Sequence, residues 1–259
     1  MIDSIKLKRI KDSKNLYNIY IEGDYLYMIR YGDYSEEIEK TKVLHAKGVN
    51  FAGPISQIKL DNGKCVVEEY LAKGTTFEKM KIDYSFSSAN ITSDEIMKNY
   101  TEFFHNYLNE LKIRAEADQE IYDKLFSDII EMNKENLTVD TCSLGNLFFD
   151  KDIGFSIIDA YPGDKIPNIK SLFWLVVGNI PSIGCKENSQ WLSSCIPYSC
   201  YNEFIEIYNK ITNKFSKALD KIKYNYNLSD FIINYNVLTT DTVAELVNKE
   251  QSNEIRISI

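Results

Sequence analysis

The first third of the chain contains four short hydrophobic segments rich in Ile, Val, Leu and Tyr, a composition that is typical of β-strands. The β-prone segments form two pairs, at residues 16–21 with 25–30 and at residues 55–60 with 64–69. Each pair is separated by a short turn rich in Gly, Asn and Asp, residues that tolerate a tight reversal of the backbone. The pattern therefore predicts two antiparallel hairpins.

A short helix is predicted between these hairpins, at residues 35–45. Ser35 is a suitable N-cap, and Glu36 and Glu37 place negative charge at the positive end of the helix. From residue 93 onward, hydrophobic residues recur at helical spacing. The predicted helices of this part cover residues 93–111, 118–134, 168–178 and 204–222, with short terminal helices at residues 229–236 and 240–249. Strands followed by helices indicate an α+β fold.

One segment interrupts the helical part of the chain. Residues 140–159 contain a polar loop, an apolar run at 147–149, a turn containing Asp and Gly, and a second apolar run at 155–158. If the two runs pair as a hairpin, Asn146 and Asp159 fall at the same end of it. An amide oxygen and a carboxylate at one place are ligands that suit Mg²⁺. A surface hairpin with ordinary polar ends is the alternative interpretation.

This segment resembles the catalytic loop and the metal-binding strand pair of the protein-kinase-like superfamily. Asn146 matches the metal-binding Asn of that loop, and Asp159 matches the Asp of the Asp-Phe-Gly motif, which here reads Asp-Ala-Tyr. The catalytic Asp of the family would fall at Thr141, and a threonine hydroxyl cannot act as a carboxylate base. The resemblance therefore implies that Asp140, one residue earlier, accepts the proton, or that phosphoryl transfer is impaired.

The resemblance extends to the N-terminal part. Arg30, at the end of the second predicted strand, stands where the family has its phosphate-binding lysine. Glu39 in the following helix would be the carboxylate partner of Arg30, although Glu36 or Glu37 could serve instead, or all three could form a solvated surface.

Residues 67–77 resemble the segment that links the two lobes of a kinase. The backbone from Glu69 to Leu71 would then face an adenine. The family's glycine-rich loop is missing, because residues 11–15 contain no glycine, and only residues 160–167 stand in place of a long activation segment. With so short an activation segment, the chain is more similar to small-molecule kinases, such as aminoglycoside or choline kinase-like enzymes, or to bacterial effector kinases.

The resemblance implies a two-lobed fold, with a small β-rich N-lobe at residues 1–75 and a helical C-lobe at residues 76–259. ATP would bind between the lobes, with Mg²⁺ held by Asn146 and Asp159. The expected activity is an atypical phosphotransfer to a small-molecule or protein acceptor. The alternative is a catalytically silent pseudokinase that acts as a binding or regulatory module, and a third reading is changed chemistry such as nucleotidyl transfer.

Composition narrows the function classes. The net charge of −8 argues against a protein dominated by nucleic-acid contacts. The longest apolar run, at residues 172–177, is too short to span a bilayer, and the N-terminus lacks the apolar core of a signal peptide. Five cysteines without a CxxC pair and two histidines give no zinc-ligand pattern. We therefore expect reduced thiols and a cytoplasmic protein, although export without a cleaved signal stays open.

Overall fold

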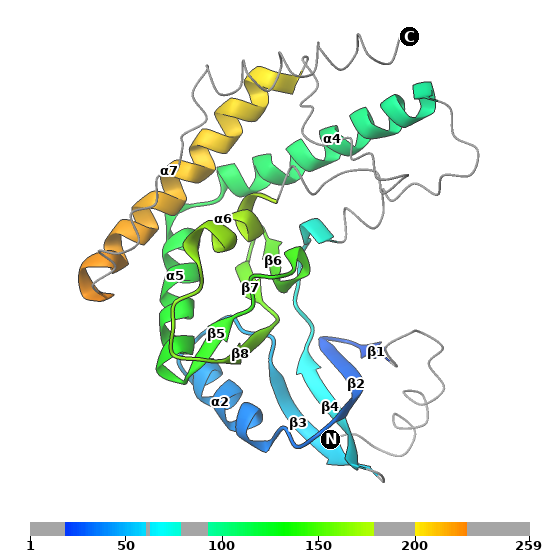
Figure 1. The fold of residues 1–259 in the computed structure, drawn as a ribbon, viewed down its shortest axis with the longest axis vertical. Helices are drawn as coiled ribbons and strands as arrows, with labels where there is room; N and C mark the ends of the chain where they lie inside the picture. The colour runs from blue at the N-terminus through cyan, green and yellow to red at the C-terminus, as the bar shows by residue number, and fades with distance from the viewer. Residues whose placement is uncertain (1–18, 61–62, 79–92, 179–199, 227–259) are drawn as a thin grey trace. The chain divides into compact units, whose positions relative to one another are not determined.

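The computed structural model describes residues 19–60, 63–78, 93–178 and 200–226 (Figure 1). The short helices expected at residues 229–236 and 240–249 lie outside this range. The fold is α+β, as the sequence predicts, and it divides into two compact units. Unit 1 contains the described parts of Met1–Gly74, Ser127–Asp140 and Asn146–Pro167, and unit 2 those of Thr75–Phe126, Thr141–Gly145 and Asn168–Ile259.

Unit 1 is built on a four-stranded antiparallel sheet with the strand order β1-β2-β4-β3 (Figure 1). Both predicted hairpins are confirmed, and β2 and β4 join them into one sheet. Gly23, in the first turn, has a φ of 62°, which a glycine adopts without steric cost. The strands are β1 (Ile19–Glu22), β2 (Tyr25–Tyr31), β3 (Pro54–Lys59) and β4 (Lys64–Tyr70).

The predicted helix between the hairpins is α2 (Ser35–Ala46), which contacts β3. Its N-cap is Tyr34 rather than the expected Ser35, and the side chain of Tyr34 makes no capping bond. The carboxylate of Asp33 accepts hydrogen bonds from the backbone N–H of Ser35 at 3.1 Å and from its hydroxyl at 2.6 Å. An acidic residue before the helix thus orders its first turn, and Ser35 acts as a donor.

The hairpin predicted in the second half of the chain is formed by β6 (Leu147–Asp150) and β7 (Gly154–Ile157), with Leu147 opposite Ile157. A short 3₁₀ helix, η3 (Leu144–Asn146), precedes it. A further antiparallel pair, β5 (Leu137–Val139) with β8 (Ala160–Pro162), was not predicted. These strands are too short for the alternation of hydrophobic residues to identify them.

Backbone hydrogen bonds tie the β6–β7 hairpin to the segment between α2 and β3. The N–H of Ala52 donates to the carbonyl of Ile157 at 2.8 Å, and the N–H of Ile157 donates to the carbonyl of Asn50 at 3.0 Å. The side-chain amide of Asn50 donates to the carbonyl of Phe155 at 2.7 Å. The hairpin therefore groups with the N-terminal sheet in unit 1, whereas the sequence analysis placed it in a C-terminal lobe at residues 76–259.

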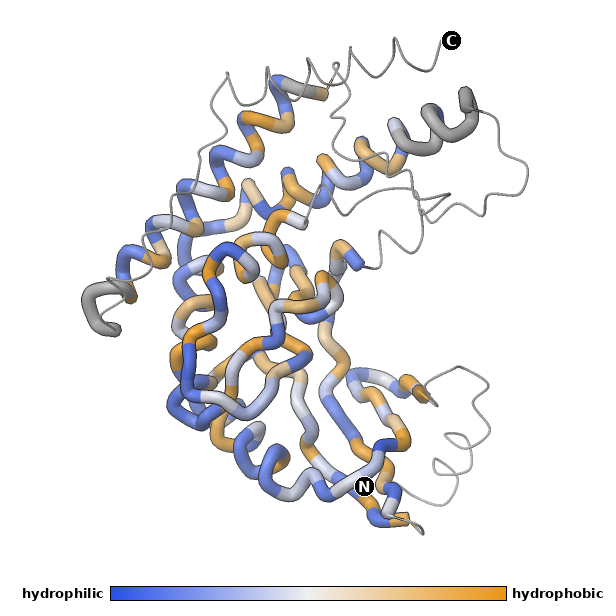
Figure 2. Tube along the Cα trace, viewed as in Figure 1, coloured by the Kyte–Doolittle hydropathy of each residue, from blue (hydrophilic) through white to orange (hydrophobic). Residues whose placement is uncertain are grey.

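The described part of unit 2 is helical, and its long helices match the predicted ones. Helix α7 packs against α4 and contacts α6, and polar and hydrophobic residues alternate along α4 and α7 (Figure 2). Aromatic side chains fill the contacts, with Phe173 and Phe215 ring centroids 5.1 Å apart. The helices are α4 (Ser93–Glu116), α6 (Ile169–Val177) and α7 (Tyr201–Tyr226), while α5 (Gln119–Lys134) is shared between the units.

The guanidinium of Arg114 lies fully buried in unit 2. It pairs with Glu110 at 3.1 Å, donates to the carbonyl of Val176 at 2.8 Å, and lies 4.1 Å from the ring centre of Phe77. Val176 belongs to the last turn of α6, where unpaired carbonyls favour a cation. Arg114 therefore closes the end of α6 inside the core.

Within the described ranges, no helix is both long enough and apolar enough to cross a membrane. Cys65, Cys142 and Cys200, the described cysteines, are all free thiols.

Candidate functional site

A cavity of about 370 Å³ lies in unit 1, and we call it the unit 1 cavity. Its size is within the range of small-molecule sites. Its charged lining residues are Arg30 from β2, Glu69 from β4, and Asp159 after β7. The apolar part of the lining includes Leu26, Met28, Ala52, Leu71, Phe148 and Ile158. Three charged groups thus face an apolar space that segments far apart in the sequence enclose.

The sheet register places Arg30 and Glu69 on the same face. Leu26 is opposite Glu69, and Arg30 is opposite Cys65, so alternation along each strand points both charged side chains to one side. The Nη2 atom of Arg30 lies 3.8 Å from Oε1 of Glu69. The side chain of Arg30 is 45% exposed and that of Glu69 only 11%, so the cation reaches solvent while the carboxylate is held inside.

Burial controls the charge of Glu69. It raises the pKa of this carboxyl to about 7, because the charged form loses its hydration. Arg30 acts against this shift and Asp159 adds to it. Glu69 is therefore poised between its neutral and charged forms near physiological pH.

Asp159 is a solvent-exposed carboxylate at the end of the hairpin. Its pKa is raised, first by desolvation and then by the negative charge of Asp140, while the N–H of Ala160 and the charge of Arg30 lower it. The N–H of Asp140 donates to the carbonyl of Asp159 at 3.1 Å, which continues the ladder in which Val139 pairs with Ala160. A cation at this place would relieve the repulsion between the two carboxylates.

Asn146 is buried at the end of η3. Its side-chain nitrogen donates to the carbonyl of Asp140 at 3.0 Å, and its own carbonyl accepts from the N–H of Ile158 at 3.1 Å. The structure thus brings Asn146 and the chain that leads into Asp159 to the same end of the hairpin, as the sequence predicts. The side-chain oxygen of Asn146 takes no part in the bond to Asp140.

The residues present fit a loosely held Mg²⁺ rather than a metal caged by the protein. Among the described residues, no group of three or more His, Cys, Asp or Glu could hold a metal. One carboxylate oxygen of Asp159 and the amide oxygen of Asn146 are ligands of the right kind. Mg²⁺ commonly keeps several waters and takes further oxygens from a bound phosphate.

The expected pairing of Glu39 with Arg30 is wrong. The side chain of Glu39 is 71% exposed and pairs with Lys42 at 2.6 Å, one turn along the same helix. Glu36, an alternative partner, pairs with Lys40 at 2.7 Å in the same way. Helix α2 satisfies these glutamates on its own surface, and Arg30 meets Glu69 of the neighbouring strand instead.

The expected role of the backbone from Glu69 to Leu71 also needs correction. The N–H of Leu71 donates to the carbonyl of Asp24 at 2.8 Å, because the pairing of β2 with β4 continues one residue past Tyr25 and Tyr70. This N–H is therefore occupied. Glu69 lies in a strand that is paired on both sides, and its side chain is what reaches the unit 1 cavity.

The position of the Glu69 side chain at the cavity is not apparent from the local sequence. The signal that could have found it is the register between β2 and β4, which places Glu69 on the face of Arg30. The predicted base, Asp140, adjoins Asp159 but does not line the unit 1 cavity.

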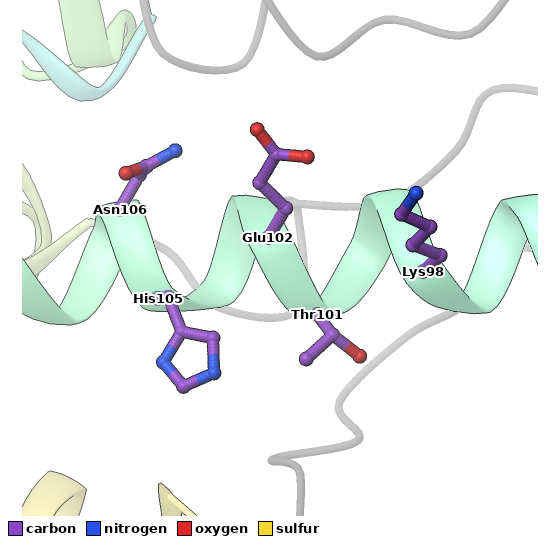
Figure 3. A pocket seen from close by; sticks show the side chains of 5 residues that line it. All are labelled: Lys98, Thr101, Glu102, His105 and Asn106. Carbon is purple, nitrogen blue, oxygen red and sulfur yellow. The ribbon is translucent and has the colours of Figure 1, made fainter.

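A second cavity, of about 530 Å³, lies along α4 in unit 2. Its lining residues are Lys98, Thr101, Glu102, His105 and Asn106. Figure 3 shows Lys98, Glu102 and Asn106 on one side of the helix and Thr101 and His105 on the other. Nδ1 of His105 lies 3.8 Å from Sγ of Cys200. Because its polar groups diverge from a single helix, this cavity is a weaker candidate than the unit 1 cavity.

No protein-family model and no curated protein matches the sequence.

Proposed function

We propose that the protein is an atypical kinase-like phosphotransferase with a two-lobed fold, which binds ATP and Mg²⁺ in the unit 1 cavity. The observation that carries the proposal is the convergence of Arg30 and Asp159 on one cavity. Both residues were singled out from separate segments of the sequence because they stand at the phosphate-binding and metal-binding positions of kinases. Their meeting in space is a coincidence that an unrelated α+β protein has no reason to show.

The lining of the cavity supports a nucleotide as the ligand. Leu26, Met28 and Leu71 give apolar surface on which a purine ring loses water. Arg30 offers a planar guanidinium, which binds phosphate oxygens in pairs. Asp159 and Asn146 would hold Mg²⁺, which neutralises charge on the β- and γ-phosphates when it is bound.

Positioning and charge neutralisation supply most of the catalysis in phosphoryl transfer. In this proposal Asp140 accepts the proton of the acceptor hydroxyl, because its carboxylate stands beside Asp159. The hydrogen bond from Asn146 to the carbonyl of Asp140 at 3.0 Å fixes the backbone at this base. The acceptor is a hydroxyl of a small molecule or of a protein.

A catalytically silent nucleotide-binding module is the second candidate. It is favoured by Thr141 at the usual position of the base, and by the pairing of Arg30 with Glu69 at 3.8 Å. An arginine that already has a carboxylate partner is less available to a transferring phosphate. Nucleotide binding is common to both candidates, so it is tested first.

The first test is thermal unfolding with ATP, Mg²⁺, both or neither. A ligand that binds only the folded state raises its stability by mass action. We expect ATP with Mg²⁺ to raise the unfolding temperature of the wild type and to lose this effect in Asp159→Ala. The control is Asp152→Ala, which removes an exposed aspartate from the turn at the other end of the hairpin and should leave the effect unchanged. No effect of ATP on the wild type would refute both candidates.

The second test separates the enzyme from the silent module. Release of ADP from ATP, and transfer of labelled γ-phosphate to the protein itself, require no knowledge of the acceptor. We expect slow turnover that Asp140→Asn abolishes while ATP binding persists. Binding without any turnover in the wild type would support the silent module.

A further inference from the structure

Two adjacent glutamates of β4 have opposite surroundings. Glu68 points away from the unit 1 cavity and accepts hydrogen bonds from the hydroxyls of Tyr27 at 2.9 Å and Ser56 at 2.5 Å. Glu69, which is buried to a similar extent, faces the cavity and meets only the guanidinium of Arg30 at 3.8 Å among the described residues. Glu68 is therefore satisfied by the fold, whereas Glu69 keeps unused capacity to accept hydrogen bonds.

Glu69 loses most of its hydration on folding and gains no hydrogen-bond donor among the described residues closer than Arg30, which costs folding free energy. A carboxylate placed at this cost beside a half-exposed arginine indicates that the pair takes part in binding a ligand. The distance of 3.8 Å between Nη2 and Oε1 is long for a charge-assisted hydrogen bond, so the guanidinium is held near the carboxylate without being saturated by it. An incoming anion can therefore compete for Arg30.

We propose that Glu69 is the positioning residue for Arg30: it holds the guanidinium at the cavity in the free protein, hands it over to the phosphate of a bound nucleotide, and takes up a proton from water as it does so. This inference rests on the proposed nucleotide site. It assigns to a strand carboxylate the task that the sequence analysis gave to Glu39 of helix α2.

The electrostatic surroundings explain the proton uptake. The charged neighbours of Glu69 are Arg30 from β2 and Asp159 from the hairpin, and Tyr34 faces the same pair from the start of α2. Pro54, its partner on β3, carries no charge. Once phosphate takes Arg30, Glu69 is left buried without the cation that favours its charged form, and this favours its neutral form. Because burial already raises the pKa of Glu69 to about 7, little free energy is needed to protonate it.

The sign of the pH dependence follows from linkage. The complex holds more protons than the free protein above the pKa of Glu69, so affinity for the nucleotide falls as the pH rises. If Glu69 is neutral in the complex throughout this range, affinity falls roughly tenfold between pH 6 and pH 8. Glu69→Gln cannot take up the proton, and its affinity should vary only with the titration of the ligand itself.

The pairing of Glu69 with Arg30 can be tested without any nucleotide. The carboxyl carbon of Glu69 is followed by NMR through a pH titration, with Glu69→Gln used for assignment. We expect Arg30→Gln to raise the midpoint, because the guanidinium lowers the pKa of Glu69, and Glu39→Gln to leave it unchanged. An unchanged midpoint in Arg30→Gln would overturn the inference.

The hand-over is tested by calorimetric titration with ATP and Mg²⁺ in two buffers of different ionisation enthalpy. The difference in heat counts the protons taken up. We expect equal uptake in the wild type and in Glu39→Gln, and in Glu69→Gln only the smaller uptake that belongs to the ligand itself. Uptake in Glu69→Gln as large as in the wild type would refute the hand-over. A wild type that binds no nucleotide would refute the proposed function, and the hand-over with it, while the titration of the free protein would still report on the pairing.

Discussion

Asp140 and Asp159 are joined through their backbones, with the N–H of Asp140 donating to the carbonyl of Asp159 at 3.1 Å. This bond continues the ladder between β5 and β8, so the two carboxylates are held as neighbours by strands rather than by a loose loop. Asp140 consequently helps to raise the pKa of Asp159. A rigid pair of like charges is an arrangement that a divalent cation stabilises.

Asp140→Asn should lower the pKa of Asp159, because it removes one of the charges that disfavour ionisation of Asp159. NMR titration of the carboxyl carbon of Asp159 measures the change. Asp152→Asn, in the turn of the same hairpin, should leave the midpoint where it is in the wild type. A midpoint that does not fall in Asp140→Asn would mean that the two carboxylates are not coupled.

Glu69→Gln should stabilise the protein at alkaline pH. The folded state raises the pKa of Glu69 from its ordinary value of 4.5 to about 7, so stability from this group is complete below its unfolded pKa and is lost as the pH rises through the folded one. The variant avoids this loss, which amounts to at most roughly 3 kcal/mol at about pH 8. Urea unfolding at about pH 5 and about pH 8 measures it, since the gain should appear only at the higher pH.

Glu68→Gln is the matched comparison for this measurement, because Glu68 is a buried glutamate of the same strand that accepts bonds from Tyr27 and Ser56. We expect it to destabilise the protein at both pH values. A gain at the higher pH in Glu68→Gln, or none in Glu69→Gln, would contradict the assignment of the two glutamates.

Arg114→Met should destabilise unit 2 by about 3–5 kcal/mol, since it leaves the charge of Glu110 buried without its partner. It also removes the bond to the carbonyl of Val176 at the end of α6. Urea unfolding is the measurement. Lys112→Met, which breaks an exposed pair with Glu203 at 3.8 Å, should cost under about 1 kcal/mol. Equal losses of unfolding free energy in the two variants would show that the buried pair of Arg114 and Glu110 stabilises the fold no more than an exposed ion pair does.

Gly74→Ala should distort the exit from β4. Gly74 has a φ of 96°, and a Cβ there would lie 2.0 Å from the carbonyl oxygen of Phe149 in β6. We expect a loss of about 2 kcal/mol or more in unfolding free energy. Gly48→Ala, with a φ of 76° and open space around it, should cost only about 1 kcal/mol. A similar loss in both would indicate that backbone conformation, and not the contact with β6, sets the requirement.

The helices and strands could be predicted from the sequence more fully than the pairing of the strands and the contacts between side chains. The hairpins are encoded by short β-prone segments and turn residues, and the long helices by hydrophobic residues at helical spacing. The structure has these elements close to where they were expected. Pairing of β2 with β4 was beyond this kind of reasoning, because it joins strands that are separated by a helix and a third strand. The same pairing explains why Glu69 and not Glu39 meets Arg30, and why the N–H of Leu71 is already bonded to Asp24.

In the candidate site, too, residues close together in the sequence could be placed in advance, whereas contacts between distant segments could not. Asn146 and Asp159 were brought to one end of a hairpin by a pattern within a short segment, so the sequence could place them. Arg30 reaches the same cavity as Asp159 only because Asn50 and Ala52 bond to Ile157, a contact over more than one hundred residues of sequence that hydrophobic periodicity does not encode.

The alternation of β4 has a consequence for how this protein can change over generations. Glu68 is required by the fold, because it accepts hydrogen bonds from two hydroxyl groups, whereas in our proposal Glu69 is required by the ligand that enters the cavity. Two identical neighbours in the chain are thus exposed to separate selective pressures. In a homologue that no longer binds the ligand, Glu69 could be substituted while Glu68 is kept. Substitution of Glu69 alone would therefore mark homologues in which the cavity has lost its function.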